Sequence, residues 1–119
     1  MAAKIAGFIL RAHHKGATAR FYRALGLELH EHRHGDGPLH FEMGPNSGEL
    51  VSEIYLRSDA FDRDAVMIEV PSIKRALDAI RDDFLFYQRE NAVKEVKGLR
   101  FVYVLDPDGR HVMICEKKK

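Results

Sequence analysis

The apolar pattern of this 119-residue chain passes through the same order of elements twice. Alternation of apolar and polar residues is typical of strands, and apolar residues three or four positions apart are typical of helices. Each half of the sequence has one strand, one helix and then three strands, and Arg57–Asp64 is a polar linker between the halves. Because a duplicated order limits the possible topologies, we predict an α+β fold of two βαβββ modules, about residues 4–57 and about residues 64–117.

In the first half, a strand is predicted at Ile5–Arg11 and a helix at Ala17–Leu25. Gly26 is expected to end this helix. Two further strands flank a predicted turn at Gly35–Pro38, and a third covers Glu49–Leu56. The helix carries apolar residues on one stripe that we expect to face the core: Ala17, Phe21, Ala24 and Leu25.

In the second half, a strand is predicted at Ala65–Val70, and Ser72 is a suitable N-cap for the next helix. A strand at Phe84–Gln88 and a polar loop at Asn91–Gly98 follow. The module closes with a hairpin over Leu99–Cys115, in whose Asp-Pro-Asp-Gly turn proline suits the second position and glycine adopts a positive φ. The apolar stripe of the helix is formed by Ile73, Ala76, Leu77 and Ile80.

Alternation along the strands separates two faces, and the helices are expected on the apolar one. That face holds Phe8, Leu10, Ser52, Ile54, Leu56, Val66, Ile68, Val70, Val112 and Ile114. The second face mixes apolar and ionisable groups, and burying unpaired charges costs on the order of several kcal/mol each. We therefore expect the mixed sheets to curve, with helices on the outer face and a ligand-binding cleft on the concave face. The second face holds Gly7, Ile9, Arg11, Val51, Glu53, Tyr55, Ala65, Met67, Glu69, His111, Met113 and Cys115.

Composition limits the class of protein. A formal net charge of +1 predicts neither nucleic acid nor a membrane surface as a partner, and the length suits one domain over residues 1–119. The single cysteine excludes an intrachain disulfide and indicates a reducing compartment. Since the N-terminal apolar run is too short for a signal peptide or membrane span, a cytoplasmic location is expected.

Three segments resemble the vicinal oxygen chelate superfamily, also called the glyoxalase, bleomycin-resistance protein and extradiol dioxygenase superfamily. ARFYRALGLEL is similar to its opening module, VMIEVPSIKRALDAI to the start of its second module, and FVYVLDPDGRHVMI to its closing hairpin. Metal-dependent members place one ligand on each of four strands, and the corresponding positions here are Gly7, Glu53, Ala65 and Met113. Only Glu53 suits a metal, so the resemblance implies a metal-free member of the bleomycin-resistance type that has no cofactor.

The leading hypothesis is a small-molecule-binding protein, expected as a homodimer, whose ligand is partly apolar. The alternative is an enzyme, a glyoxalase-like lyase, isomerase or dioxygenase with a displaced metal site or with Glu53 as general base. Purely structural roles stay open, such as an ion pair between Arg11 and Glu69. The candidate ligand-binding residues are Arg11, Glu53, Tyr55, Met67, Glu69, His111 and Met113.

A group of histidines marks the first-half hairpin. His30, His32 and His34 share one face by their spacing of two, and His40 stands across the hairpin. Imidazoles in this arrangement can bind a cation together. The alternative is that these histidines form a solvent-facing stripe with no ligand. Cys115 is expected to pack in the interior rather than act as a nucleophile.

Overall fold

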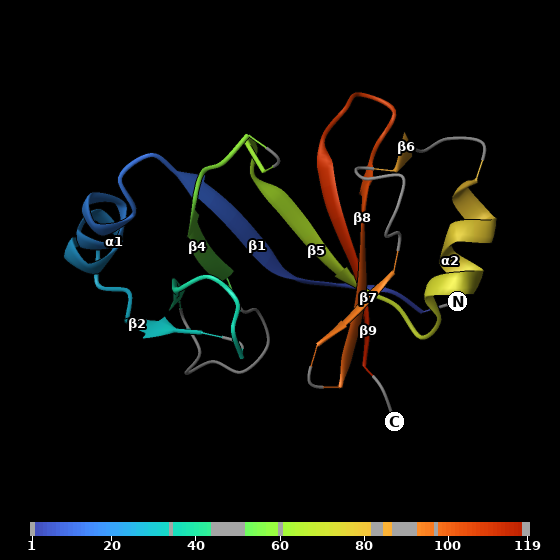
Figure 1. Cartoon of the computed structure of the whole chain (residues 1–119), viewed down its shortest axis with the longest axis horizontal. Helices are drawn as coiled ribbons and strands as arrows, with labels where there is room; N and C mark the ends of the chain where they lie inside the picture. Colours follow the sequence, from blue (N-terminus) through green and yellow to red (C-terminus); the bar gives the residue numbers. More distant parts are fainter. Residues whose placement is uncertain are drawn as a thin grey trace. The chain divides into compact units, whose positions relative to one another are not determined.

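A computed structural model of the chain describes residues 2–33, 35–43, 52–59, 61–81, 85–86, 93–96 and 98–117 (Figure 1). The chain divides into two compact units, the N-terminal unit of Ala6–Asp64 and the C-terminal unit of Ala65–Lys119 with Met1–Ile5. The described residues contain two helices and nine strands, so the predicted α+β class is confirmed. Neither described helix, of ten and eight residues, has the length and apolar composition needed to cross a membrane.

The N-terminal unit has the predicted order of strand, helix and three strands (Figure 1). Its strands lie in the order β2-β3-β4-β1, with β1 parallel to β4 and the other neighbours antiparallel. The turn between β2 and β3 uses Gly35 at φ 56°, a backbone conformation that glycine adopts without strain. The elements are β1 (Lys4–Ala12), α1 (Lys15–Ala24), β2 (Leu29–His32), β3 (His40–Met43) and β4 (Ser52–Leu56).

The C-terminal unit repeats this topology and adds one short strand, β7, which pairs with β8. Its strands lie in the order β5-β9-β8-β6, and β5 runs parallel to β9 as β1 does to β4. The predicted duplication of the βαβββ order is therefore confirmed. The elements are β5 (Ala65–Glu69), α2 (Ile73–Ile80), β6 (Leu85–Phe86), β7 (Lys94–Val96), β8 (Leu99–Leu105) and β9 (His111–Lys117).

One strand in this unit was not predicted. β7 lies inside the segment Asn91–Gly98, which we expected to be a polar loop, and it pairs with β8. All three of its side chains are exposed, so backbone pairing forms this strand and no apolar pattern marks it in the sequence. β6 falls within the strand predicted at Phe84–Gln88, whose remaining residues lie outside the described ones.

The core of the N-terminal unit lies between α1 and the sheet, but α1 presents a different stripe from the predicted one. Ala19 and Tyr22 face the sheet, and Arg23, on the same stripe, lies over Phe41 and donates to the Leu29 carbonyl at 3.0 Å. The predicted stripe is exposed instead: Ala17, Phe21, Ala24 and Leu25. A small residue at position 19, which is 0% exposed, lets the helix backbone approach the sheet closely.

Two strand residues that we expected to meet α1 are also exposed. Phe8 is 46% exposed and Leu56 is 56% exposed, although both lie on the apolar face. A helix of ten residues is about 15 Å long, whereas the nine residues of β1 span about 30 Å. The helix therefore covers only part of the apolar face. The core beneath it consists of Ala12, Ala19, Leu29, Phe41, Met43 and Ile54, with Leu10 and Tyr22 packed against it.

In the C-terminal unit, the predicted helical stripe is confirmed. Ile73 and Ala76 are buried, and Leu77 and Ile80 pack against the same cluster. This stripe covers β8 and β9 (Figure 1) at Val102, Val104 and Ile114. The sheet residues Val70, Ile68 and Val112 complete the cluster.

Two side chains satisfy the N-terminus of α2. The Ser72 hydroxyl accepts a hydrogen bond from the Arg75 N–H at 3.2 Å, which confirms the predicted N-cap. The Glu116 carboxylate, on β9, accepts the Ile73 N–H at 2.6 Å and lies 3.3 Å from the Arg100 guanidinium. A carboxylate at this position also interacts favourably with the positive end of the helix dipole.

Replacing Ser72 with alanine should lower the free energy of unfolding by about 1 kcal/mol, because the Arg75 N–H loses its acceptor. The Ser72→Asp variant keeps an acceptor and should retain most of the wild-type stability. Urea unfolding of the three proteins measures this. Equal stability of Ser72→Ala and wild type would contradict the cap.

The turn between β8 and β9 also forms as predicted. The Asp106 carboxylate accepts the backbone N–H groups of Arg110 and Asp108, both at 2.9 Å, and Gly109 has φ 84°. The bond from the Arg110 N–H, followed by bonds from the Arg110 side chain and the Asp108 N–H, lowers the pKa of Asp106 below 3.8. The ionised carboxylate thus stabilises the closing hairpin.

A lowered pKa in the folded state means that this stabilisation is complete above pH 3.8 and is lost as the pH falls through the lowered value. The Asp106→Asn variant should therefore be less stable than wild type at neutral pH and equally stable in strong acid. Urea midpoints at both pH values check this. The exposed turn residue Asp36, changed to asparagine, is the matched control, and an equal effect of both substitutions would refute the role of Asp106.

Candidate functional site

Strand pairing in the N-terminal unit gathers ionisable side chains on one face of its sheet, which we call the polar face. Glu53 lies opposite Ile9 on one side and Glu42 on the other, and Tyr55 lies opposite Arg11. Residues directly opposite one another point to the same side of a sheet. The core residues alternate with these positions, so α1 covers the other side. The polar face consists of Ile9, Arg11, His30, His32, His40, Glu42, Glu53 and Tyr55.

A histidine and a carboxylate meet at the centre of the polar face. His40 is 0% exposed, Glu53 is 7% exposed, and His40 Nε2 lies 2.7 Å from Glu53 Oε2. The imidazole also stacks on the Tyr55 ring, with centroids 4.2 Å apart and an interplanar angle of 14°. Burial of a carboxylate is costly unless a partner compensates its charge, and His40 is that partner.

The protonation of His40 follows from its second contact. His40 Nδ1 lies 3.1 Å from the Pro38 carbonyl oxygen. Since a carbonyl oxygen only accepts hydrogen bonds, we assign the proton to Nδ1. Nε2 is then the nitrogen that faces Glu53 Oε2, and because two acceptor atoms 2.7 Å apart need a proton between them, a cation that binds Nε2 would displace this proton.

Glu42 brings a second carboxylate to this pair. Its Oε1 lies 3.8 Å from His40 Nε2 and 3.5 Å from His32 Nε2. The ligand atoms of His40, Glu42 and Glu53 all lie within 4.8 Å of one another. One imidazole and two carboxylates at this spacing can exchange a proton or hold a divalent cation.

Arg11 lies at the edge of the polar face on β1. Its guanidinium carbon is 4.7 Å from the Tyr55 ring centroid and 4.6 Å from that of Phe61. Among the described residues, no carboxylate forms an ion pair with this guanidinium. Asp64 instead accepts a hydrogen bond from the Arg11 backbone N–H at 2.8 Å. The side chain is half-buried, so its charge is held on aromatic surface.

The remaining predicted residues share a face of the C-terminal unit. Met67 lies opposite Met113, and two residue pairs earlier on β5 Ala65 lies opposite His111. Met67, Met113 and His111 are all buried, and Glu69 Oε2 lies 3.5 Å from Lys4 Nζ. The structure thus brings the predicted residues together in two sets, one set of three on the N-terminal unit and one set of four on the C-terminal unit.

Two other predictions concern single residue types. Cys115 is 3% exposed and its thiol donates to the Ile68 carbonyl at 3.5 Å, which fits the expected packing role. His30 and His32 are exposed, as a solvent-facing stripe would be, but His40 is fully buried. His34 lies outside the described residues.

The four family metal positions do not fit a divalent cation. Gly7 and Ala65 have no donor atom, and Met113 offers only a thioether. Glu53 is the single hard donor among them, and the structure gives it His40 as a partner. The four positions together therefore offer one carboxylate, which is too few ligands to hold such an ion.

Sequence reasoning missed Glu42 altogether and left His40 in a histidine stripe. Both residues alternate with the core residues Phe41 and Met43, so their common face is visible in the sequence. What the sequence lacks is the register between β3 and β4, which sets Glu42 opposite Glu53. A turn of unknown conformation between two strands does not determine their register.

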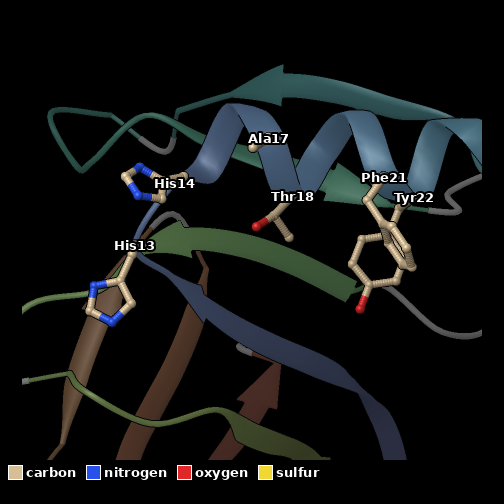
Figure 2. Close-up of a pocket in the computed structure, with 6 residues that line it drawn as sticks. All are labelled: His13, His14, Ala17, Thr18, Phe21 and Tyr22. Carbon is tan, nitrogen blue, oxygen red and sulfur yellow. The ribbon is translucent and has the colours of Figure 1, made fainter.

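A separate pocket lies on the α1 side of the sheet, away from the polar face. Figure 2 shows two histidines before α1 and two aromatic rings near its end, with a hydroxyl group between them. The cavity volume is about 450 Å³, and His13 Nε2 lies 2.8 Å from an Arg57 guanidinium nitrogen. None of these residues was predicted as part of a site. The lining residues are His13, His14, Ala17, Thr18, Phe21 and Tyr22.

Solved structures with similar folds come from several kinds of protein. A hypothetical protein of Bacillus halodurans C-125 matches with a TM-score of 0.73 and 16% identity, over 100% of this chain and 97% of that one. A glyoxalase/bleomycin resistance protein/dioxygenase superfamily member from Vibrio splendidus 12B01 matches with a TM-score of 0.64 and 13% identity, over 98% and 100%. Streptomyces coelicolor methylmalonyl-CoA epimerase matches with a TM-score of 0.62 and 18% identity, over 98% of both chains.

No protein-family model matches the sequence, and a search of curated proteins found no match. Identities below one fifth in all three structural matches mean that the similarity concerns the fold alone. The duplicated βαβββ topology agrees with that similarity and with the three segments noted in the sequence. The chain has the fold of the glyoxalase, bleomycin-resistance protein and dioxygenase superfamily.

Proposed function

We propose that this chain is a small-molecule-binding protein of the glyoxalase and bleomycin-resistance type, and that its ligand is partly apolar and carries an anionic group. One observation carries the proposal, namely the Arg11 guanidinium held between the rings of Tyr55 and Phe61. Among the described residues it has no carboxylate partner. A planar guanidinium binds a carboxylate or phosphate through two parallel hydrogen bonds, and the flanking rings offer apolar surface.

The polar face supplies a second, differently charged contact for such a ligand. Tyr55 touches both Arg11 and the His40 ring, so the cation and the His40–Glu53 pair belong to one connected row of side chains. A ligand carboxylate at Arg11 and a hydroxyl or carbonyl group near Glu53 would be oriented by opposite charges. The candidate ligand-binding residues of the C-terminal unit, Met67, Glu69, His111 and Met113, stay predictions from the sequence.

The proposal also covers the metal content, the oligomeric state and the location expected from the sequence. The ligand site uses no metal at the four family positions, where only Glu53 has a hard donor. We propose a homodimer in the cytoplasm. A single cysteine, Cys115, which lies buried, agrees with a reducing compartment.

Aromatic carboxylates such as benzoate and naphthoate should bind this chain more tightly than their neutral amides. Titration by two-dimensional NMR should move the Arg11 side-chain signal and the signals of Tyr55. Arg11→Gln should weaken binding by about tenfold or more, because the charged hydrogen bonds are lost.

Arg20→Gln is the matched control, since Arg20 is exposed on α1 and lies on the other side of the sheet. It should bind the carboxylates as wild type does. Equal affinity of carboxylates and amides, or unchanged affinity in Arg11→Gln, would remove Arg11 from the site. Melting temperatures of both variants show whether the fold is intact.

A second function, that of a glyoxalase-like lyase, isomerase or dioxygenase, is favoured by the contact between Glu53 and His40 at 2.7 Å. In this version Glu53 is a general base that removes a proton beside a substrate carbonyl, and His40 stabilises the carboxylate. Exchange of that proton in 2-oxo acids with deuterated water should occur and should be lost in Glu53→Gln. Absence of exchange in the wild-type chain over a panel of 2-oxo acids would count against the enzyme.

A further inference from the structure

We propose that His40, Glu42 and Glu53 form a binding site for a divalent transition-metal ion such as Zn²⁺ or Mn²⁺. Two of the three ligands come from β3, a strand that holds none of the four family metal positions. The sequence led us to expect no metal, and the site proposed here differs from the four family positions in every ligand except Glu53. It rests on the geometry of these three side chains and does not depend on the ligand proposed for Arg11, although both sites include Glu53.

The donor atoms already lie near the spacing that such an ion requires. Ligands at about 2.0–2.2 Å around a tetrahedral ion lie roughly 3.4 Å from one another. His40 Nε2 is 2.7 Å from Glu53 Oε2 and 3.8 Å from Glu42 Oε1, and all three atoms lie within 4.8 Å of one another. Side-chain rotations that move the donor atoms by about 1 Å would bring them to the required distances.

The surroundings of His40 hold its ring in the orientation of a metal ligand. Its Nδ1–H donates to the Pro38 carbonyl at 3.1 Å, and the ring is fixed on the face of Tyr55. A backbone carbonyl on one ring nitrogen is the usual outer contact of a metal-binding histidine, because it fixes the tautomer and leaves the other nitrogen to the metal. Complete burial of His40 separates this site from an exposed histidine stripe.

Charge gives an independent reason for a cation at this place. Glu42 and Glu53 lie directly opposite each other on neighbouring strands, on the same face of the sheet. Like charges in directly opposed positions are destabilising. Once the proton between His40 and Glu53 is displaced, the imidazole and the two carboxylates carry a charge of −2, which a divalent cation balances. The pair of glutamates is thus explained by the ion between them.

The donor set also indicates which ions fit. One nitrogen and two carboxylate oxygens suit zinc, manganese and ferrous iron better than calcium, which prefers six or more oxygen ligands. Three protein ligands leave at least one position open for water or an added ligand, as in catalytic rather than structural zinc sites. His32 Nε2 lies 3.5 Å from Glu42 Oε1, so His32 would contact a metal ligand and not the ion itself.

The test is metal binding by the full chain prepared without a histidine tag and stripped with a chelator. Calorimetric titration with zinc chloride, and separately with manganese chloride, should show one ion bound per chain for at least one of the two metals. The melting temperature should rise by about 5 °C at saturating metal. Lack of stoichiometric binding of either ion by the wild-type chain would overturn the site.

Variants locate the ion. Glu42→Gln removes one ligand from a half-buried position and should weaken binding at least tenfold, whereas Glu31→Gln, the matched control on the other face of the hairpin, should bind as wild type. His30→Ala removes an exposed imidazole and should also leave binding unchanged. Wild-type affinity in Glu42→Gln, or its loss in His30→Ala, would place the ion on the histidine stripe and overturn the proposal.

Discussion

The register between β3 and β4 determines what the N-terminal unit presents on its polar face. With Glu42 opposite Glu53, the residues that alternate with the core on β3 are brought against those on β4. A shift of one residue would exchange the two faces and bury Glu42 under α1 while exposing Phe41 and Met43. The burial of those two apolar residues therefore holds the acidic and imidazole groups in place.

Buried charge is the second constraint on this unit. Glu53 is only 7% exposed to water. A buried carboxylate needs a positive or hydrogen-bonding partner. His40 provides it at 2.7 Å, and Tyr55 and Pro38 hold the imidazole from two sides. The residues that stabilise the buried acid are thus the same residues that give the face its chemistry. Because proteins with this fold have many different activities, the function depends on this local arrangement of side chains and not on the fold.

The two units have the same topology but differ in how their helices are attached. In the C-terminal unit, Ser72 and Glu116 satisfy the start of α2, and its apolar stripe is buried as its spacing predicts. Among the described residues, no side chain makes a capping hydrogen bond at His14, the N-cap of α1, and a small alanine determines which side of the helix meets the sheet. Large apolar side chains such as Phe21 therefore stay exposed and line the pocket on that side.

The sequence by itself determined the α+β class, the duplicated order of elements, the turn at Asp106 and the cap at Ser72. These features depend on residues close together in the chain, whose spacing and backbone preferences can be read directly. Only the tertiary structure decided which stripe of α1 is buried, that Lys94–Val96 forms a strand, and that His40 and Glu42 meet Glu53. Those outcomes depend on register and on packing between distant segments, and local spacing carries no information about either.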